Sequence, residues 1–186
     1  MKTKVAIRSF LLGVAVMAAG TAVGAGFYDL KTKTLGGKDI DLKQYSGKVG
    51  LVVNTASMCG YTGQYKELQD VWSKYRDKGL IVLGFPSNDF GKQEPGTDKD
   101  IKEFCDLKYR VTFPMFSKGA VTGKDKQSVY KFLTEDGNPA LKGEVKWNFE
   151  KFLVDKKGNI VARFPSAVMP DDKQVVDKID ALLKEK

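Results

Sequence analysis

The chain has 186 residues, of which 31 are basic and 23 acidic, with two cysteines and no histidine. The absence of histidine excludes Cys-His and Ser-His-Asp catalytic arrangements and most zinc or iron sites. The two cysteines, Cys59 and Cys105, are too few for a disulfide-rich scaffold, so they supply either one disulfide or two free thiols.

The first 25 residues have the pattern of a secretory signal peptide. Lys2, Lys4 and Arg8 precede an apolar stretch of small and aliphatic side chains over residues 10–24. We expect cleavage after Ala25, which would make the protein periplasmic or secreted. An uncleaved membrane anchor is the alternative, although a full span needs about 20 predominantly apolar residues.

Residues 26–186 form the expected mature chain, which is long enough for one domain with a sizeable core. The signal contains three of the basic residues, so the mature chain keeps 28 basic and 23 acidic residues and a net charge of +5. Its lysines are scattered, as on an ordinary solvated surface. We therefore predict no nucleic-acid partner.

The predicted elements of the mature chain alternate between strands and helices. This alternation, with a hairpin near the end, predicts an α/β helix-sheet-helix sandwich with a mixed central sheet. In chain order we expect a hairpin around Gly36-Gly37, a strand over 49–56, a helix over 64–78, a strand over 80–87, a loop over 89–97, a helix over 98–109 capped by Thr97 or Asp98, an extended segment over 111–116, a helix over 124–137, a hairpin over 151–164 and a helix over 170–186.

Cys59 is expected in the turn that joins the first central strand to the helix after it. Open α/β sheets place their sites at this end of the strands. The unpaired N–H groups and partial positive charge of a helix N-terminus favour a thiolate over a thiol, and Gly60 lets backbone amides approach the sulfur. A buried, inert cysteine at a strand end is the alternative interpretation.

Three segments resemble the signature segments of the glutathione peroxidase family in its cysteine-containing form. They are NTASMCGYT (54–62), FPSNDFGKQEPG (85–96) and VKWNFEKFLVDKKG (145–158), in this order, and the resemblance continues through residues 101–123. It implies a thioredoxin-like fold and a thiol-dependent peroxidase that reduces hydrogen peroxide and organic hydroperoxides. It also implies a role in the oxidative stress response.

The resemblance implies four catalytic residues: Cys59 as the peroxide-attacking cysteine, together with Gln93, Trp147 and Asn148. A thiolate that attacks a peroxide needs neutral hydrogen-bond donors for the sulfur anion and for the departing oxygen. Two amides and an indole N–H supply such donors without histidine. Taken singly, Gln93 fits an ordinary loop residue, Trp147 a core aromatic and Asn148 a turn residue.

Cys105 is the candidate resolving cysteine. After attack, Cys59 is a sulfenic acid, which an outside thiol or a second cysteine must reduce. Members of the family that use thioredoxin carry a resolving cysteine in this region, but alignment on Phe113 and Pro114 places it at Asp106, one position further along. One residue on a helix turns a side chain by about 100°. Cys105 can also be a core residue, and a resolving role would require local unwinding of its helix.

The resemblance implies no metal and no cofactor. The expected partners are a hydroperoxide and a thiol reductant, either a thioredoxin-like protein or glutathione. The connection between Leu133 and Trp147 is short and lacks the insertion with which tetrameric relatives assemble, so we expect a monomer.

Two other functions start from the same cysteine. A thioredoxin-type disulfide oxidoreductase normally needs C-x-x-C, and here the fourth position is Thr62. A peroxide-sensing relay protein would use the same first step as the enzyme, so turnover is what separates the two.

Overall fold

The computed structural model describes residues 26–185. The predicted signal peptide lies outside the described residues, so its cleavage and the export of the protein stay predictions. Among the helices of residues 26–185, none combines the length and the apolar character that a bilayer crossing requires.

A four-stranded mixed sheet forms the centre of the fold, with β3 (Val49–Thr55), β4 (Leu80–Pro86), β5 (Lys151–Val154) and β6 (Ile160–Phe164). The strand order is β4-β3-β5-β6. β3 runs parallel to β4 and antiparallel to β5, and β5 runs antiparallel to β6. Every residue of β3, β4 and β5 is buried, as expected for strands that are covered on both faces.

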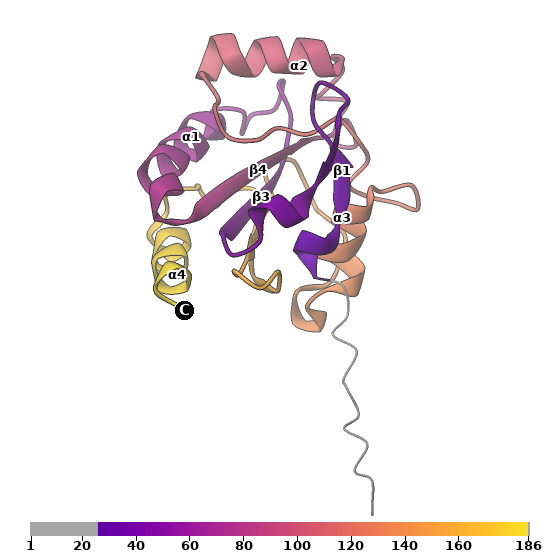
Figure 1. The fold of residues 1–186 in the computed structure, drawn as a ribbon. Helices are drawn as coiled ribbons and strands as arrows, with labels where there is room; N and C mark the ends of the chain where they lie inside the picture. The colour runs from indigo at the N-terminus through magenta and orange to yellow at the C-terminus, as the bar shows by residue number, and fades with distance from the viewer. Residues whose placement is uncertain (1–25, 186) are drawn as a thin grey trace, which may run out of the picture.

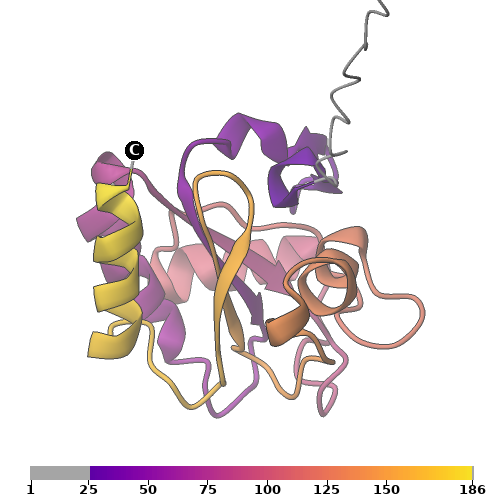
Figure 2. The ribbon, with the colours of Figure 1, turned by 90° about the horizontal axis from the view of Figure 1, so that it is seen from below.

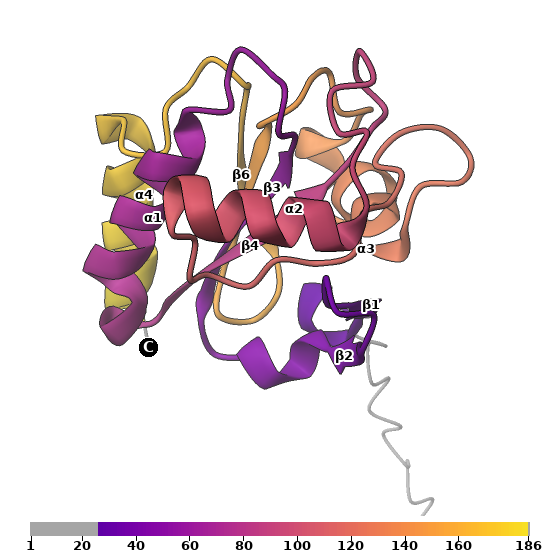
Figure 3. The same ribbon diagram turned by 90° about the horizontal axis from the view of Figure 1, so that it is seen from above.

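Helices cover both faces of this sheet. Figure 2 shows α1 (Gln64–Tyr75) beside α4 (Lys173–Lys184) on one side, and α3 (Ser128–Lys131) on the other. In the view of Figure 1, α2 (Asp98–Phe104) crosses the top of the molecule, and it lies nearest the viewer in Figure 3. The expected helix-sheet-helix sandwich with a mixed sheet is therefore confirmed.

The sheet divides the core into two clusters. The first contains the inward side chains of α1 and α4 together with Ile101 and Cys105 from the region of α2. The second contains the side chains of α3 and of the N-terminal segment, including Phe27 and Leu42. Both cysteines belong to the first cluster, on the side of α1.

The predicted N-terminal hairpin is present as β1 (Lys31–Lys33) and β2 (Asp39–Asp41), which pair antiparallel. Gly37 has a φ of +76°, a left-handed conformation that glycine adopts at no steric cost. The hairpin lies apart from the main sheet, below α2 in the view of Figure 3.

Two predicted helices differ from the observed ones. The helix expected over 124–137 begins only at Ser128, because the Gln127 N–H bonds to the carbonyl of Ala120 over 3.0 Å and closes the preceding residues into a turn. The helix expected over 98–109 is α-helical to Phe104, and its last turn, Cys105–Tyr109, is π-helical. Its cap is Thr97, which accepts the N–H of Asp100.

The topology brings the sequence-predicted site residues to one edge of the sheet. Cys59 follows β3, and Gln93 follows β4, which runs parallel to β3. Trp147 and Asn148 precede β5, which is antiparallel to β3, so they reach the same edge. This edge contains the carboxyl ends of the parallel strands, where sites of α/β sheets are found.

Candidate active site

Cys59 lies in a tight turn between β3 and α1. The N–H of Tyr61 points at the Cys59 Sγ over 3.4 Å, and the side chain of Cys59 is 9% exposed. The first turn of α1 is closed by backbone bonds such as that from the Gln64 N–H to the carbonyl of Tyr61. The amide that reaches the sulfur therefore comes from the turn before the helix, and it directs a hydrogen-bond donor at the sulfur.

Thr62 fastens this turn. Its Oγ1 accepts the N–H of Cys59 over 2.9 Å and donates to the carbonyl of Ala56 over 2.8 Å. Its own N–H returns to the carbonyl of Cys59 over 3.0 Å. Position 62 thus has a structural hydroxyl where a dithiol oxidoreductase has its second cysteine.

Gln93 is tied to the residue before Cys59. The N–H of Met58 donates to the carbonyl of Gln93 over 3.0 Å. The chain reaches this position through two consecutive left-handed residues, Gly91 at φ +61° and Lys92 at φ +56°. A Cβ at Gly91 would lie 3.3 Å from Gln93 Nε2, so glycine at this position leaves room for the Gln93 side chain.

Asn148 contacts Gln93 directly. Its Nδ2 donates to Gln93 Oε1 over 3.0 Å, and its side chain is fully buried. Because the Gln93 oxygen is used in this bond, the group of Gln93 that remains for a reactant is its NH2. Within the described residues, Asn148 Oδ1 has no hydrogen-bond partner. A buried acceptor without a partner is unusual in a folded protein and is expected mainly where a reactant or water binds.

Large apolar side chains are exposed in the segments that contain Cys59 and Asn148. Met58 is 68% exposed and Trp147 is 39% exposed, and Tyr61 is also exposed. The ring of Trp147 packs against that of Phe90, with centroids 5.6 Å apart. Four large apolar side chains near one edge make this an apolar rim, here defined as Met58, Tyr61, Phe90 and Trp147.

A buried carboxylate stands behind the cysteine turn. Glu94 is 1% exposed and accepts the hydroxyl of Ser57 over 3.0 Å. Burial raises the pKa of Glu94, while the Ser57 bonds and the nearby Lys118 lower it. Lys118 Nζ also donates to the Glu94 carbonyl over 3.3 Å, so both residues hold the segment after Gln93.

A buried lysine holds the loop before α4. Lys151 is fully buried, and its Nζ donates to the carbonyls of Pro165, Ser166 and Val168. Gln64 at the start of α1 donates to the same Ser166 carbonyl over 2.7 Å. Burial lowers the pKa of Lys151 to about 8.

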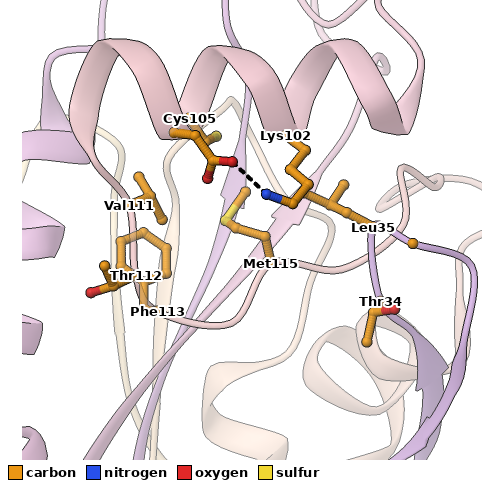
Figure 4. A pocket seen from close by; sticks show the side chains of 10 residues that line it. Thr34, Leu35, Lys102, Cys105, Val111, Thr112, Phe113 and Met115 are labelled. Carbon is orange, nitrogen blue, oxygen red and sulfur yellow. Dashed lines mark hydrogen bonds and ion pairs between the residues drawn. The ribbon is translucent and has the colours of Figure 1, made fainter.

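Cys105 lies on the first residue of the π-helical turn, and its side chain is 1% exposed. Burial raises its pKa to about 11, and the neighbouring Tyr65 hydroxyl acts in the opposite direction. The thiol lines a cavity of about 360 Å³ beneath α2, together with Leu35 from the N-terminal hairpin and Met115 (Figure 4). Neither cysteine forms a disulfide in the described part of the chain.

The structure thus brings Gln93 and Asn148 into contact and links Gln93 to the cysteine turn, with Trp147 on the rim. Cys105 lies separately, inside the core on the α1 side. Sequence reasoning missed the supporting residues, because a hydroxyl or a carboxylate near a cysteine has no pattern of its own. The sequence offered one signal for each of two such residues. Asn54 is a polar side chain at the end of an apolar strand, and Thr62 is a polar side chain in the turn that follows. In residues 26–185, no group of three or more acidic or cysteine side chains is placed to hold a metal ion.

Comparison with known proteins gives consistent matches to one family. The sequence profile described as glutathione peroxidase matches residues 27–134. The glutathione peroxidase-like peroxiredoxin 2 of Saccharomyces cerevisiae is 53% identical over 146 residues, which cover 77% of this chain and 90% of the yeast protein. The hydroperoxy fatty acid reductase of Synechocystis is 46% identical over 151 residues, covering 78% of this chain and 89% of the relative.

A solved structure shows the same fold. The crystal structure of Trgpx in apo form matches with a TM-score of 0.69 and 38% identity, covering 87% of this chain and 97% of the other. The fold is thioredoxin-like, and the expected activity is confirmed at the level of thiol-dependent peroxide reduction. From its fold, its strand-edge site and these relatives, the chain belongs to the glutathione peroxidase family.

Proposed function

We propose that Cys59 is the peroxide-attacking residue of this peroxidase and that Gln93, Trp147 and Asn148 are its neutral hydrogen-bond donors. The observation that carries the proposal is the bond from Asn148 to Gln93, 3.0 Å long, next to the backbone bond from Met58 to Gln93. This arrangement fixes the amide of Gln93 with its NH2 group available to a reactant. An indole N–H and an amide keep their hydrogen atoms at every pH at which the enzyme works.

The proposed first step balances without a metal or a cofactor. A lone pair of the Cys59 thiolate forms the S–O bond, the O–O bond breaks, and the departing alkoxide or hydroxide takes a proton. The proton that the thiol releases on ionisation balances this uptake. The products are the Cys59 sulfenic acid and an alcohol or water. Donors aimed at the developing oxyanion lower the barrier, because they need no reorganisation during the step.

The apolar rim supports organic hydroperoxides as substrates beside hydrogen peroxide. Met58, Tyr61 and Trp147 present apolar surface next to Cys59, and such surface binds an alkyl or acyl chain by excluding water. The name of the Synechocystis relative, hydroperoxy fatty acid reductase, agrees with this substrate class. A higher rate constant for a fatty acid hydroperoxide than for hydrogen peroxide, lost in Met58→Ser, would support the assignment.

The sulfenic acid must then be reduced by thiols. In the proposed route, Cys105 condenses with it, forming a disulfide and releasing water, and a thioredoxin-like protein reduces that disulfide. The buried thiol of Cys105 and the pKa of about 11 mean that its helix turn has to open first. The segment that has to open in this route is the π-helical turn Cys105–Tyr109, which is followed by Arg110 with a φ of +51°.

The test is peroxide consumption by the wild-type protein, Cys59→Ser and Cys105→Ser, with thioredoxin or glutathione as the only reductant. We expect no turnover in Cys59→Ser, and activity at the wild-type rate in that variant would refute the assignment. Loss of thioredoxin-linked turnover alone in Cys105→Ser would establish resolution. Unchanged turnover with thioredoxin would show that the outside thiol reduces the sulfenic acid directly, and it would leave Cys105 as a core residue. Consumption of a single equivalent of peroxide per chain would instead favour a sensor.

We also propose that the protein is exported and monomeric. Support for export comes from the charged and apolar pattern of residues 1–25. Support for a monomer comes from the short connection before Trp147. Fractionation of cells, with mass determination of the mature N-terminus, tests the first proposal, and light scattering of the purified chain tests the second.

A further inference from the structure

Asn54 is a fully buried polar residue at the end of β3, and the proposed chemistry gives it no role. It stands five positions before Cys59 on the same strand-to-helix connection. All of its side-chain hydrogen bonds go to the segment that contains Trp147 and Asn148. Its Nδ2 donates to the carbonyl of Trp147 over 3.0 Å, and its Oδ1 accepts the N–H of Glu150 over 3.0 Å.

The backbone of Asn54 completes this arrangement. Its carbonyl accepts the N–H of Phe149 over 2.6 Å. The three bonds therefore bracket Asn148, with one to the residue before it and two to the residues after it. A side chain must carry a donor and an acceptor on one short branch to make both side-chain bonds, and asparagine does so.

The bracketed segment is strained. Phe149 has a φ of +63°, which is uncommon for any residue with a Cβ and costs about 1–3 kcal/mol. The β3-β5 ladder ends at the pair Val53–Lys151, one position before Asn54, because the chain bends at Phe149. The polar groups that this bend removes from the ladder are the ones that Asn54 satisfies. Such a conformation persists only where the surroundings fix it.

We propose that Asn54 is a positioning residue of the peroxidase: it locks the bend at Phe149 and so holds Trp147 and Asn148 at the edge of the sheet where Cys59 lies. Asn148 then reaches Gln93, and the indole of Trp147 stays on the apolar rim. This inference rests on the proposed roles of Trp147 and Asn148. Asn54 itself acts through them and does not contact the reacting atoms.

The bend has other supports, so Asn54 variants should fold. Glu150 forms an ion pair with Arg163, and its Oε2 accepts the N–H of Lys146 over 2.7 Å. These contacts keep the segment attached to β6 when the Asn54 side chain is shortened. The segment would then stay attached to β6, but the positions of Trp147 and Asn148 within it would no longer be fixed.

Asn138 offers a matched control. It is partly buried, its Nδ2 donates to the carbonyl of Ile160 over 2.9 Å, and its Oδ1 accepts the N–H of Ala140 over 3.0 Å. Asn138→Ala therefore removes the same two kinds of bond as Asn54→Ala. Ile160 pairs with Val154 at the end of β5 that is far from Trp147, so this change leaves the proposed site intact.

The experiment uses two readouts in a Trp72→Phe background, where Trp147 is the remaining tryptophan of the chain's two. The first readout is the second-order rate constant for oxidation of Cys59 by hydrogen peroxide in a single turnover. The second is the emission maximum and acrylamide quenching of Trp147. We expect Asn54→Ala to shift the emission and to lower the rate constant about 10- to 100-fold, because a displacement near 1 Å has effects of this size. Asn138→Ala should change neither beyond about twofold.

Asn54→Asp provides a second variant if Asn54→Ala shows no cooperative unfolding transition and is therefore not folded. It keeps the acceptor for Glu150 and removes the donor to Trp147, so the same emission shift and a lower rate constant are expected. A folded Asn54 variant with unchanged Trp147 emission, or with a shifted emission and the wild-type rate constant, would overturn the proposal. Failure of the proposed function itself would show separately, in variants that keep Asn54. It would appear as wild-type peroxide consumption in Cys59→Ser, or as a wild-type rate constant for Cys59 oxidation in both Trp147→Phe and Asn148→Ala.

Discussion

The Nδ2 of Asn148 donates to the Oε1 of Gln93 over 3.0 Å, although the two residues lie 55 positions apart in the chain. Each stands beside a left-handed residue, Lys92 before Gln93 and Phe149 after Asn148. Strain of this kind is concentrated at functional sites, so two strained positions that flank one hydrogen bond support the proposed roles of both amides.

Replacing Asn148 by aspartate should lower the rate constant for Cys59 oxidation about 100-fold, more than Asn148→Ala does. Aspartate removes the donor to Gln93 and adds a negative charge near the developing anion. Stopped-flow oxidation by hydrogen peroxide measures the effect. Comparison of the two variants separates the two causes, since alanine removes the donor without adding a charge. Equal rate constants for the wild type and both variants would contradict the role of Asn148.

Thr62→Val keeps the shape of the side chain and removes its hydroxyl. The N–H of Cys59 and the carbonyl of Ala56 then lose their partner inside the protein. We expect a loss of about 1–3 kcal/mol in the free energy of unfolding and slower oxidation of Cys59. Urea denaturation and single-turnover kinetics measure the two effects. Thr62→Ser should restore both, and a valine variant as stable and as fast as the wild type would exclude the fastening role.

Lys151 should give the protein an unusual pH dependence of stability. Its pKa is about 8 in the folded chain and near 10.5 when unfolded. Between these values the unfolded state binds more protons, so stability rises with pH in this window. The expected gain from this group is about 2 kcal/mol between pH 7 and pH 9.5. The nearby Asp172 and Glu150 reduce the shift but leave its direction unchanged.

Denaturant titrations of the wild type and Lys151→Met at several pH values test this expectation. The difference between the two proteins isolates the lysine, because the other groups are common to both. The stability of the wild type relative to the variant should rise from pH 7 to pH 9.5. A constant difference across that range would mean that Lys151 stays charged in the folded state.

The two thiols should differ in their reaction with iodoacetamide. At pH 7.5 the folded, reduced protein should be modified at Cys59, while Cys105 should react only after denaturation. The reason is the burial of Cys105 and its pKa of about 11. Peptide mass analysis identifies the labelled residue, and Cys59→Ser serves as the control. Faster labelling of Cys105 in the native protein would show that its helix turn opens more readily than its burial suggests.

The fold class follows from the sequence alone, and the resemblance to a family predicts the reactive residues. The apolar strands, the amphipathic helix before Gly79 and the hairpin before Phe164 are local patterns, and each is present. The helix predicted to Lys78 is α-helical to Tyr75 and continues as a 3-10 turn over Arg76–Lys78. The proposed roles of Cys59, Gln93, Trp147 and Asn148 come from the resemblance. These four residues lie at one edge of the sheet because of the directions of β3, β4 and β5. The alternation of strands and helices in the sequence predicted part of this arrangement.

Only the tertiary structure decided which groups hold the site and where Cys105 lies. Asn54, Thr62 and Glu94 act through hydrogen bonds to residues that lie beside them only after the chain has folded back. Such partners follow no periodic pattern in the sequence. The sequence left Cys105 between a core residue and a resolving cysteine. The structure buries it at the first residue of a π-helical turn, in the core cluster that also contains Ile101. Hydrophobic pattern is a local property, whereas the pairing of buried polar groups depends on the whole fold.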